Sequence, residues 1–184
     1  GGGISNRGTL TISASTVSGN LANSLGGGIQ NDSRYGGTFS FSILNSQIKN
    51  NISKDQGGGV SNQGNLTITH STISGNSATN QGGGIRNDSR YGGTFLMAVA
   101  NTTISGNSAN EGGGVRNMGP LSIWNTTIAN NTAITGNGGG VINDSRSGNS
   151  GIQTLTNVTI AGNSANSSGG AFYNVGGTVK IYNS

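Results

Sequence analysis

The chain has 184 residues, of which 36 are glycine, 30% are hydrophobic and 8% are charged, and its formal net charge is +4. This length suits one domain, and the sparse positive charges form no basic cluster of the kind that nucleic-acid-binding proteins carry. The absence of cysteine excludes disulfides and thiolate metal sites, and no apolar run is long enough for a membrane helix. The sequence therefore predicts no nucleic-acid partner, no direct membrane span, and no cofactor or metal site.

Three consecutive glycines followed by Ile or Val, one variable residue and Asn form a motif that recurs along the chain. Fixed-period self-similarity of this kind is the signature of a solenoid. Successive copies are 25, 31, 25, 30, 26 and 31 residues apart, which predicts rungs of about 25 residues with longer loops on alternate rungs. The six complete copies and one degenerate copy begin at Gly1, Gly26, Gly57, Gly82, Gly112, Gly138 and Gly169.

The first unit shows which strands each rung is expected to contain. Ile4, directly after the glycines, marks a first strand, and the alternation of apolar and polar residues over Leu10–Ile12 predicts a second. Val17 marks a third strand, and the small residue Ala22 follows it. One unit cannot bury its own apolar face, whereas stacked units bury a continuous column. We therefore predict an all-β fold, a right-handed parallel β-helix of between six and seven rungs with three short strands per rung.

Asparagine recurs at two fixed positions in each unit, one after the glycine motif and one at the end of the third strand. If the rungs stack in register, each side-chain amide can donate a hydrogen bond to the amide one rung away. We predict a first structural ladder of Asn6, Asn31, Asn62, Asn87, Asn117, Asn143 and Asn174, and a second of Asn20, Asn51, Asn76, Asn107, Asn131 and Asn163.

A third, partial asparagine column is expected at a corner, because asparagine tolerates left-handed backbone angles. His70, the only histidine, is interpreted as a substitution in this column rather than as a catalytic residue, and Ala14 is a second departure. The asparagines of the column are Asn45, Asn101, Asn125, Asn157 and Asn183.

The extra length of alternate units lies in the insertions 31–37, 87–93 and 143–149. We expect these loops to protrude from one edge, where solenoids often place a binding face. Their charges favour a structural interpretation, turn capping and Asp–Arg pairing, because they recur with the repeat, whereas an active site is a local break in periodicity. Glycan or partner binding and polysaccharide cleavage by clustered carboxylates remain alternatives. The candidate binding-loop residues are Asp32, Arg34, Tyr35, Asp88, Arg90, Tyr91, Asp144 and Arg146.

A column of threonines precedes the apolar residue of the third strand and is expected to point outward. Flat ranks of outward threonine resemble the ice-binding faces of some β-solenoids, although threonine is also common on solvated sheets. Gln47 and Lys49 interrupt the ranks. The column contains Thr16, Thr72, Thr103, Thr127 and Thr159.

The pairing of Ile/Val-x-x-Asn with the following glycine motif, as in Ile73–Asn76 before Gly82–Ile85, resembles the repeats of chlamydial polymorphic outer-membrane proteins. The segment Ser71–Ala78 is also similar to repeats of secreted bacterial right-handed parallel β-helix proteins. The chlamydial resemblance implies a surface adhesin passenger. The other matches are Val17–Asn20, Ile48–Asn51, Ile104–Asn107, Ile128–Asn131 and Ile160–Asn163.

These observations favour a non-catalytic extracellular structural or adhesive solenoid on a bacterial cell surface, such as a stalk, adhesin or filament building block. Its expected partners are further copies of itself, through rung ends or flanks, or surface glycans. The alternatives are a carbohydrate-binding or carbohydrate-cleaving β-helix and an ice-binding solenoid. We expect one solenoid over residues 1–184 that is a piece of a longer chain, with super-repeats 1–56, 57–111 and 112–168 and a partial rung 169–184.

Overall fold

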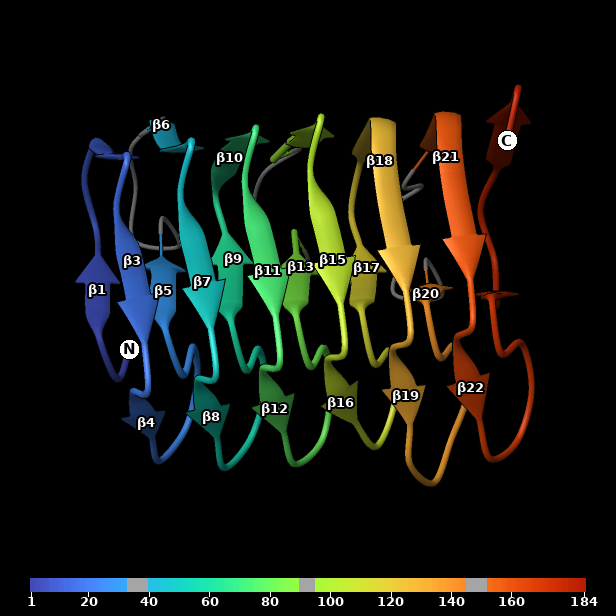
Figure 1. Ribbon diagram of the computed structural model, residues 1–184, viewed down its shortest axis with the longest axis horizontal. Helices are drawn as coiled ribbons and strands as arrows, with labels where there is room; N and C mark the ends of the chain where they lie inside the picture. The colour runs from blue at the N-terminus through green and yellow to red at the C-terminus, as the bar shows by residue number, and fades with distance from the viewer. Residues whose placement is uncertain (33–39, 90–94, 145–151) are drawn as a thin grey trace.

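The computed structural model describes residues 1–32, 40–89, 95–144 and 152–184. The regular secondary structure within these ranges consists of β-strands alone. They form six complete turns of the chain, called rungs 1 to 6 below, and a partial seventh. In Figure 1 the chain rises through β1, β5 and β9 at the back, descends through β3, β7 and β11 at the front, and moves from left to right. The coil is therefore a right-handed parallel β-helix. No helix among the described residues could cross a membrane.

In the part of the chain that the structure describes, rungs 1 to 4 contain four strands each. Rung 1 has β1 (Ile4–Asn6), β2 (Leu10–Ser13), β3 (Thr16–Ser18) and β4 (Leu21–Ala22). Rung 2 has β5 (Ile29–Asp32), β6 (Ser40–Leu44), β7 (Gln47–Lys49) and β8 (Ile52–Ser53). Rung 3 has β9 (Val60–Gln63), β10 (Asn65–Thr69), β11 (Thr72–Ser74) and β12 (Ser77–Ala78). Rung 4 has β13 (Ile85–Asp88), β14 (Met97–Ala100), β15 (Thr103–Ser105) and β16 (Ser108–Ala109).

The later rungs have fewer and longer strands. Rung 5 has β17 (Val115–Met118), β18 (Leu121–Ala129) and β19 (Thr132–Ala133). Rung 6 has β20 (Val141–Asn143), β21 (Gln153–Ala161) and β22 (Ser164–Ala165), and the partial rung has β23 (Phe172–Asn174) and β24 (Val179–Tyr182).

The expectation of three strands per rung is wrong for rungs 1 to 4, because the column of small residues beginning at Ala22 pairs between rungs and forms a fourth strand. In rungs 5 and 6 the second and third strands join into the nine-residue strands β18 and β21. Asn125 and Asn157 keep positive φ angles of 47° and 53° within these strands, so the chain still turns there.

Three parallel sheets cover the coil, and each pairs equivalent residues of successive rungs. Sheet A joins β1, β5, β9, β13, β17, β20 and β23 in that order. Sheet B joins the second and third strands of the rungs, and sheet C joins β4, β8, β12, β16, β19 and β22. Because strands in a sheet lie about 4.8 Å apart, each rung advances the coil by that distance.

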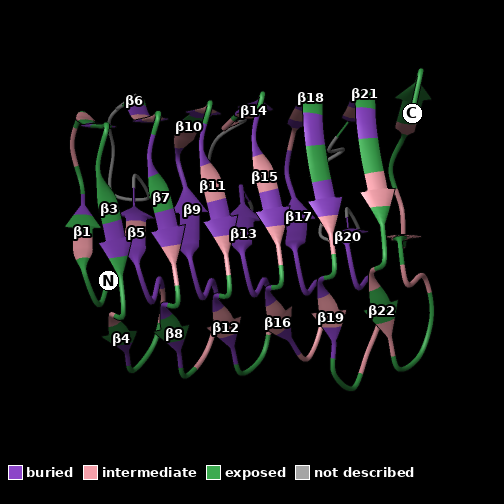
Figure 2. Ribbon diagram, in the orientation of Figure 1, coloured by how far each residue is buried: buried purple, intermediate pink, exposed green. Residues whose placement is uncertain are grey.

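The interior is a stack of matching apolar side chains. Ile29 pairs with Val60, Val60 pairs with Ile85, and all three are fully buried in one core cluster. Ile48 in β7 and Ile73 in β11 form an equivalent buried pair within the third strands of their rungs. Figure 2 shows that buried residues are concentrated in the middle rungs, above all in the strands of sheet A, and that the first and last rungs are mostly exposed or intermediate. The shared lining confirms that the repeats stack in register along one axis.

The three glycines of each motif are needed for different reasons. Gly82 has a φ of +67°, which side chains disfavour. A Cβ on Gly83 would lie 2.6 Å from the carbonyl carbon of Ser108 in β16. A Cβ on Gly84 would lie 3.1 Å from Cγ of Asn107, a member of the second ladder. The backbone of the glycine turn therefore packs directly against the neighbouring strand and the second asparagine ladder. The glycine motif of one rung thus contacts the asparagine of an Ile/Val-x-x-Asn motif.

Gln153 is a polar residue in an apolar column, where its neighbours on adjacent rungs are Leu121 and Val179. Its side chain is fully buried, and neither amide atom has a hydrogen-bond partner in the described part of the chain. We expect Gln153→Met, which keeps the volume and removes both polar atoms, to raise the free energy of unfolding by about 2 kcal/mol in urea titrations. The same change at exposed Gln47 should alter it by less than about 0.5 kcal/mol. A destabilised Gln153→Met would contradict this interpretation.

Candidate functional site

The first asparagine ladder runs without a break along sheet A. In each step an amide nitrogen donates to the side-chain oxygen of the asparagine on the next rung, at distances of 2.7 to 3.1 Å. Asn62 and Asn117 also donate to the carbonyl oxygens of Gly64 and Gly119 and so close the short turns after their strands. The ladder therefore ties neighbouring rungs together and shapes the corner within a rung.

The second ladder is bonded more densely, as Asn76 illustrates. Its backbone N and its Nδ2 both donate to Oδ1 of Asn107 at 2.9 Å, and its own Oδ1 accepts from N and Nδ2 of Asn51 at 3.0 Å. Its second amide hydrogen bonds the carbonyl oxygen of Ile48 at 2.9 Å. Both predicted ladders are confirmed as continuous hydrogen-bonded columns from Asn6 to Asn174 and from Asn20 to Asn163.

The third column occupies the corner inside sheet B, and its members have positive φ angles of 47° to 53°. His70 shares this backbone conformation with a φ of 50° and is exposed, which fits its interpretation as a substitution in the column. Exposed side-chain amides bond between rungs here as well, because Asn157 donates to Asn125 at 3.1 Å and Asn125 donates to Asn101 at 3.3 Å.

A ladder of hydroxyl groups follows the same corner and was not predicted. The backbone N of Ser46 donates to Oγ of Ser71 at 3.1 Å, and the backbone N of Ser71 donates to Oγ1 of Thr102 at 3.3 Å. Each hydroxyl also donates to the carbonyl oxygen two residues earlier in its own rung. The recurring Ser or Thr one residue after the third asparagine column was the available signal.

The three aspartates of the long units are buried, and they are not exposed on a protruding loop as a binding residue would be. Asp32 and Asp88 end strands β5 and β13, and Asp144 directly follows β20. Oδ2 of Asp88 forms an ion pair with Arg86, on the same strand. The remaining candidate loop residues, Arg34, Tyr35, Arg90, Tyr91 and Arg146, lie outside the described residues, so the binding loop stays a prediction.

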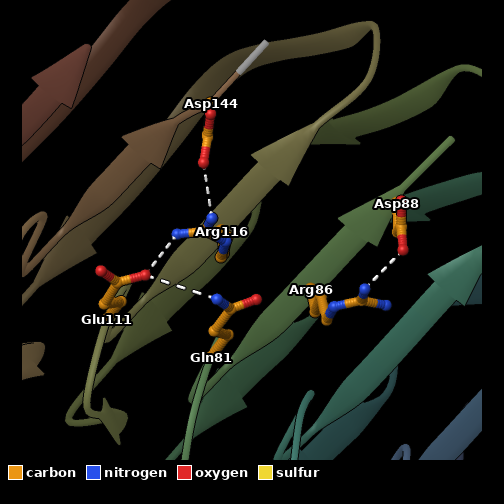
Figure 3. A network of polar contacts seen from close by, with 6 residues as sticks. All are labelled: Gln81, Arg86, Asp88, Glu111, Arg116 and Asp144. Atoms are coloured by element: carbon orange, nitrogen blue, oxygen red, sulfur yellow. Dashed lines mark hydrogen bonds and ion pairs between the residues drawn. The ribbon is translucent and has the colours of Figure 1, made fainter. Parts of the chain in front are cut away.

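An ionic network built around the buried arginines Arg86 and Arg116 lies on sheet A (Figure 3). Arg116 donates through Nη2 to Oδ2 of Asp144 at 2.6 Å and through Nη1 to Oε2 of Glu111 at 2.7 Å. Gln81 Nε2 reaches the same Glu111 oxygen at 3.4 Å, and Arg86, the rung-4 neighbour of Arg116, pairs with Asp88. Buried charges are costly unless paired, so the two guanidinium groups depend on these carboxylates.

Sequence reasoning missed Arg86 and Arg116, which occupy the variable position of the glycine motif. Strand alternation places this position on the outer face, opposite the core, where exposure is expected. Yet Ser61, Arg86 and Arg116 are all buried. Two arginines at equivalent positions of successive repeats were the available signal, because stacking in register places them side by side.

Among the described residues, two shallow hollows lie beside sheet C. One, of about 420 Å³, is lined by four amide side chains, Thr135 and Glu111, whose carboxylate is already held by Arg116. The other, of about 300 Å³, lies along β19 and β22. Within the described ranges, no three His, Asp or Glu side chains gather closely enough to hold a metal ion.

The threonine column points outward on sheet B, as expected. Thr72 pairs with Thr103, Thr103 pairs with Thr127, and the series continues to Thr159, opposite the buried isoleucines. The ranks are not continuous over the coil, because Thr72 pairs on its other side with Gln47.

One segment of the chain, which contains both the Ile/Val-x-x-Asn motif and the glycine motif, is similar to a known protein family. Residues 70–88 match the family model of the Chlamydia polymorphic membrane protein repeat. This segment runs from the corner at His70 through Asn76 and the glycine turn to Asp88 in β13. The match and the parallel sheets together support the resemblance inferred from the motifs. No match was found among the curated proteins or among the solved structures.

Proposed function

We propose that this chain is a rigid, non-catalytic segment of a bacterial cell-surface protein. There it acts as a stalk that holds an adhesive surface away from the cell, or it carries that surface itself. The continuous second asparagine ladder carries this proposal. Each rung is bonded to the next through backbone pairs and through buried amides, so bending the coil would break several hydrogen bonds at once. A solenoid braced in this way is suited to hold a shape over distance.

Two further observations support a structural role at a surface. The repeat that residues 70–88 match belongs to membrane proteins of Chlamydia. The carboxylates of Asp88, Glu111 and Asp144 pair with buried arginines, so they are engaged in holding the fold rather than converging on an open cleft.

The surface location can be tested with antibodies raised against the folded chain. Intact cells that produce the protein should be labelled, and their labelling should match that of permeabilised cells. A cytoplasmic marker on the same cells should be labelled only after permeabilisation. If the chain behaved like the cytoplasmic marker, the proposed location would be wrong.

A further inference from the structure

Trp124, the only tryptophan of the chain, lies on the outer face of sheet B rather than in the core. The residue is 36% exposed and lies between Ala100 and Thr156 on the neighbouring rungs. Tyr182, which is 50% exposed, is the next partner in this column after Thr156. Two aromatic side chains thus share one outward column two rungs apart, which is about 9.6 Å. Exposed tryptophan and tyrosine supply apolar contact area together with a polar tip, which is typical of binding surfaces.

Exposed amides accompany the aromatic column one residue further along each strand. Asn125, Asn157 and Asn183 follow Trp124, Thr156 and Tyr182, and all three are exposed at positive φ. Nδ2 of Asn157 donates one hydrogen to Asn125 at 3.1 Å, so the second hydrogen of that amide faces solvent. Amides can donate to and accept from hydroxyl groups, and here they recur on the three successive strands β18, β21 and β24 or directly after them.

The charge around this surface restricts the kind of ligand. Lys180 is the single charged residue within β18, β21 and β24. These strands therefore hold no cluster of charges that would select a strongly charged ligand, and the ligand that fits best is uncharged, offers flat C–H faces to the aromatic rings, and carries hydroxyl groups for the amides. Pyranose sugars have both features. In an extended β-1,4-linked chain alternate rings present the same face, which suits aromatic side chains separated by two rungs.

We propose that Trp124 and Tyr182, together with Asn125, Asn157 and Asn183, form a binding platform for a neutral, extended β-1,4-linked saccharide chain. The inference deepens the adhesive part of the proposed function, on which it rests, by naming the class of ligand.

Because Trp124 is the sole tryptophan, its fluorescence reports directly on the platform. We expect cellotetraose or chitotetraose, titrated into the 184-residue chain, to change the emission saturably, and maltotetraose, which coils, to bind at least about tenfold more weakly. Affinity should be nearly independent of salt, because a neutral ligand displaces few ions. The absence of a saturable change with both β-linked probes at millimolar concentration would overturn the proposal, and so would equal binding of maltotetraose.

Variants locate the site independently of the tryptophan signal. Tyr182→Ala should weaken binding of the better probe about tenfold in both fluorescence and calorimetry. Tyr173→Ala, which removes a half-buried aromatic residue from sheet A in the same partial rung, should leave affinity unchanged. Equal losses in both variants, or none in Tyr182→Ala, would contradict the platform. These titrations use purified protein, so they can fail while the surface labelling succeeds, and the reverse.

Discussion

Gly83→Ala should lower the free energy of unfolding by about 3 kcal/mol, because the new methyl group would overlap backbone atoms that cannot move independently. The alanine Cβ would lie 2.5 Å from the carbonyl oxygen of Gly113 on the next rung and 2.6 Å from the carbonyl carbon of Ser108. Relief of this overlap must separate rungs 4 and 5 or displace β16. The urea midpoint and the hydrogen exchange of the amides in rungs 4 and 5 measure the effect.

Gly8→Ala is the matched control. A Cβ at Gly8 has no atom within 4 Å, and its φ is not in the left-handed region. We therefore expect a change in stability within about 0.5 kcal/mol, with a small gain from the reduced flexibility of the unfolded chain. If Gly83→Ala were as well tolerated as Gly8→Ala, the close approach of the glycine turn to its neighbours would not be what requires glycine.

Asn76→Ala should destabilise the chain by about 3–5 kcal/mol, because it removes four hydrogen bonds from a fully buried position. The change leaves the backbone N of Asn51 and the carbonyl oxygen of Ile48 without these partners. Buried polar groups that lose their partners carry the full cost of desolvation. Thermal unfolding followed by circular dichroism gives the size of the loss.

Two further variants distinguish the contribution of the ladder hydrogen bonds from the effect of replacing any asparagine. Asn20→Ala, at the first and half-buried member, removes only the donation from Nδ2 to Asn51, so its cost should be about 1 kcal/mol. Asn76→Asp keeps the acceptor for Asn51 but loses both donated bonds, and it should be destabilising at neutral pH. A well-tolerated Asn76→Asp would show that donation along the ladder is unimportant.

The coil and its ladders could be predicted from the sequence because every rung repeats one pattern. Ile29, Val60 and Ile85 stand at equivalent positions, so a single register satisfies all of them at once. The fourth strand was missed because strands of two residues, such as Leu21–Ala22, are too short to show alternation. The loop residues Arg34 and Arg90 lie outside the described part of the chain, so their predicted role is unchanged.

The stacking axis, the apolar lining and the asparagine ladders follow from the amino-acid pattern alone, because their spacing repeats and parallel pairing places equally spaced residues above one another. The burial of Arg86 and Arg116 on the outer face of sheet A, and the exposure of Trp124 on sheet B, could be known only from the folded arrangement. Alternation along a strand assigns a side chain to a face, but burial on that face depends on what else packs there. That packing involves Glu111 and Asp144, on segments that do not share the strand of Arg116.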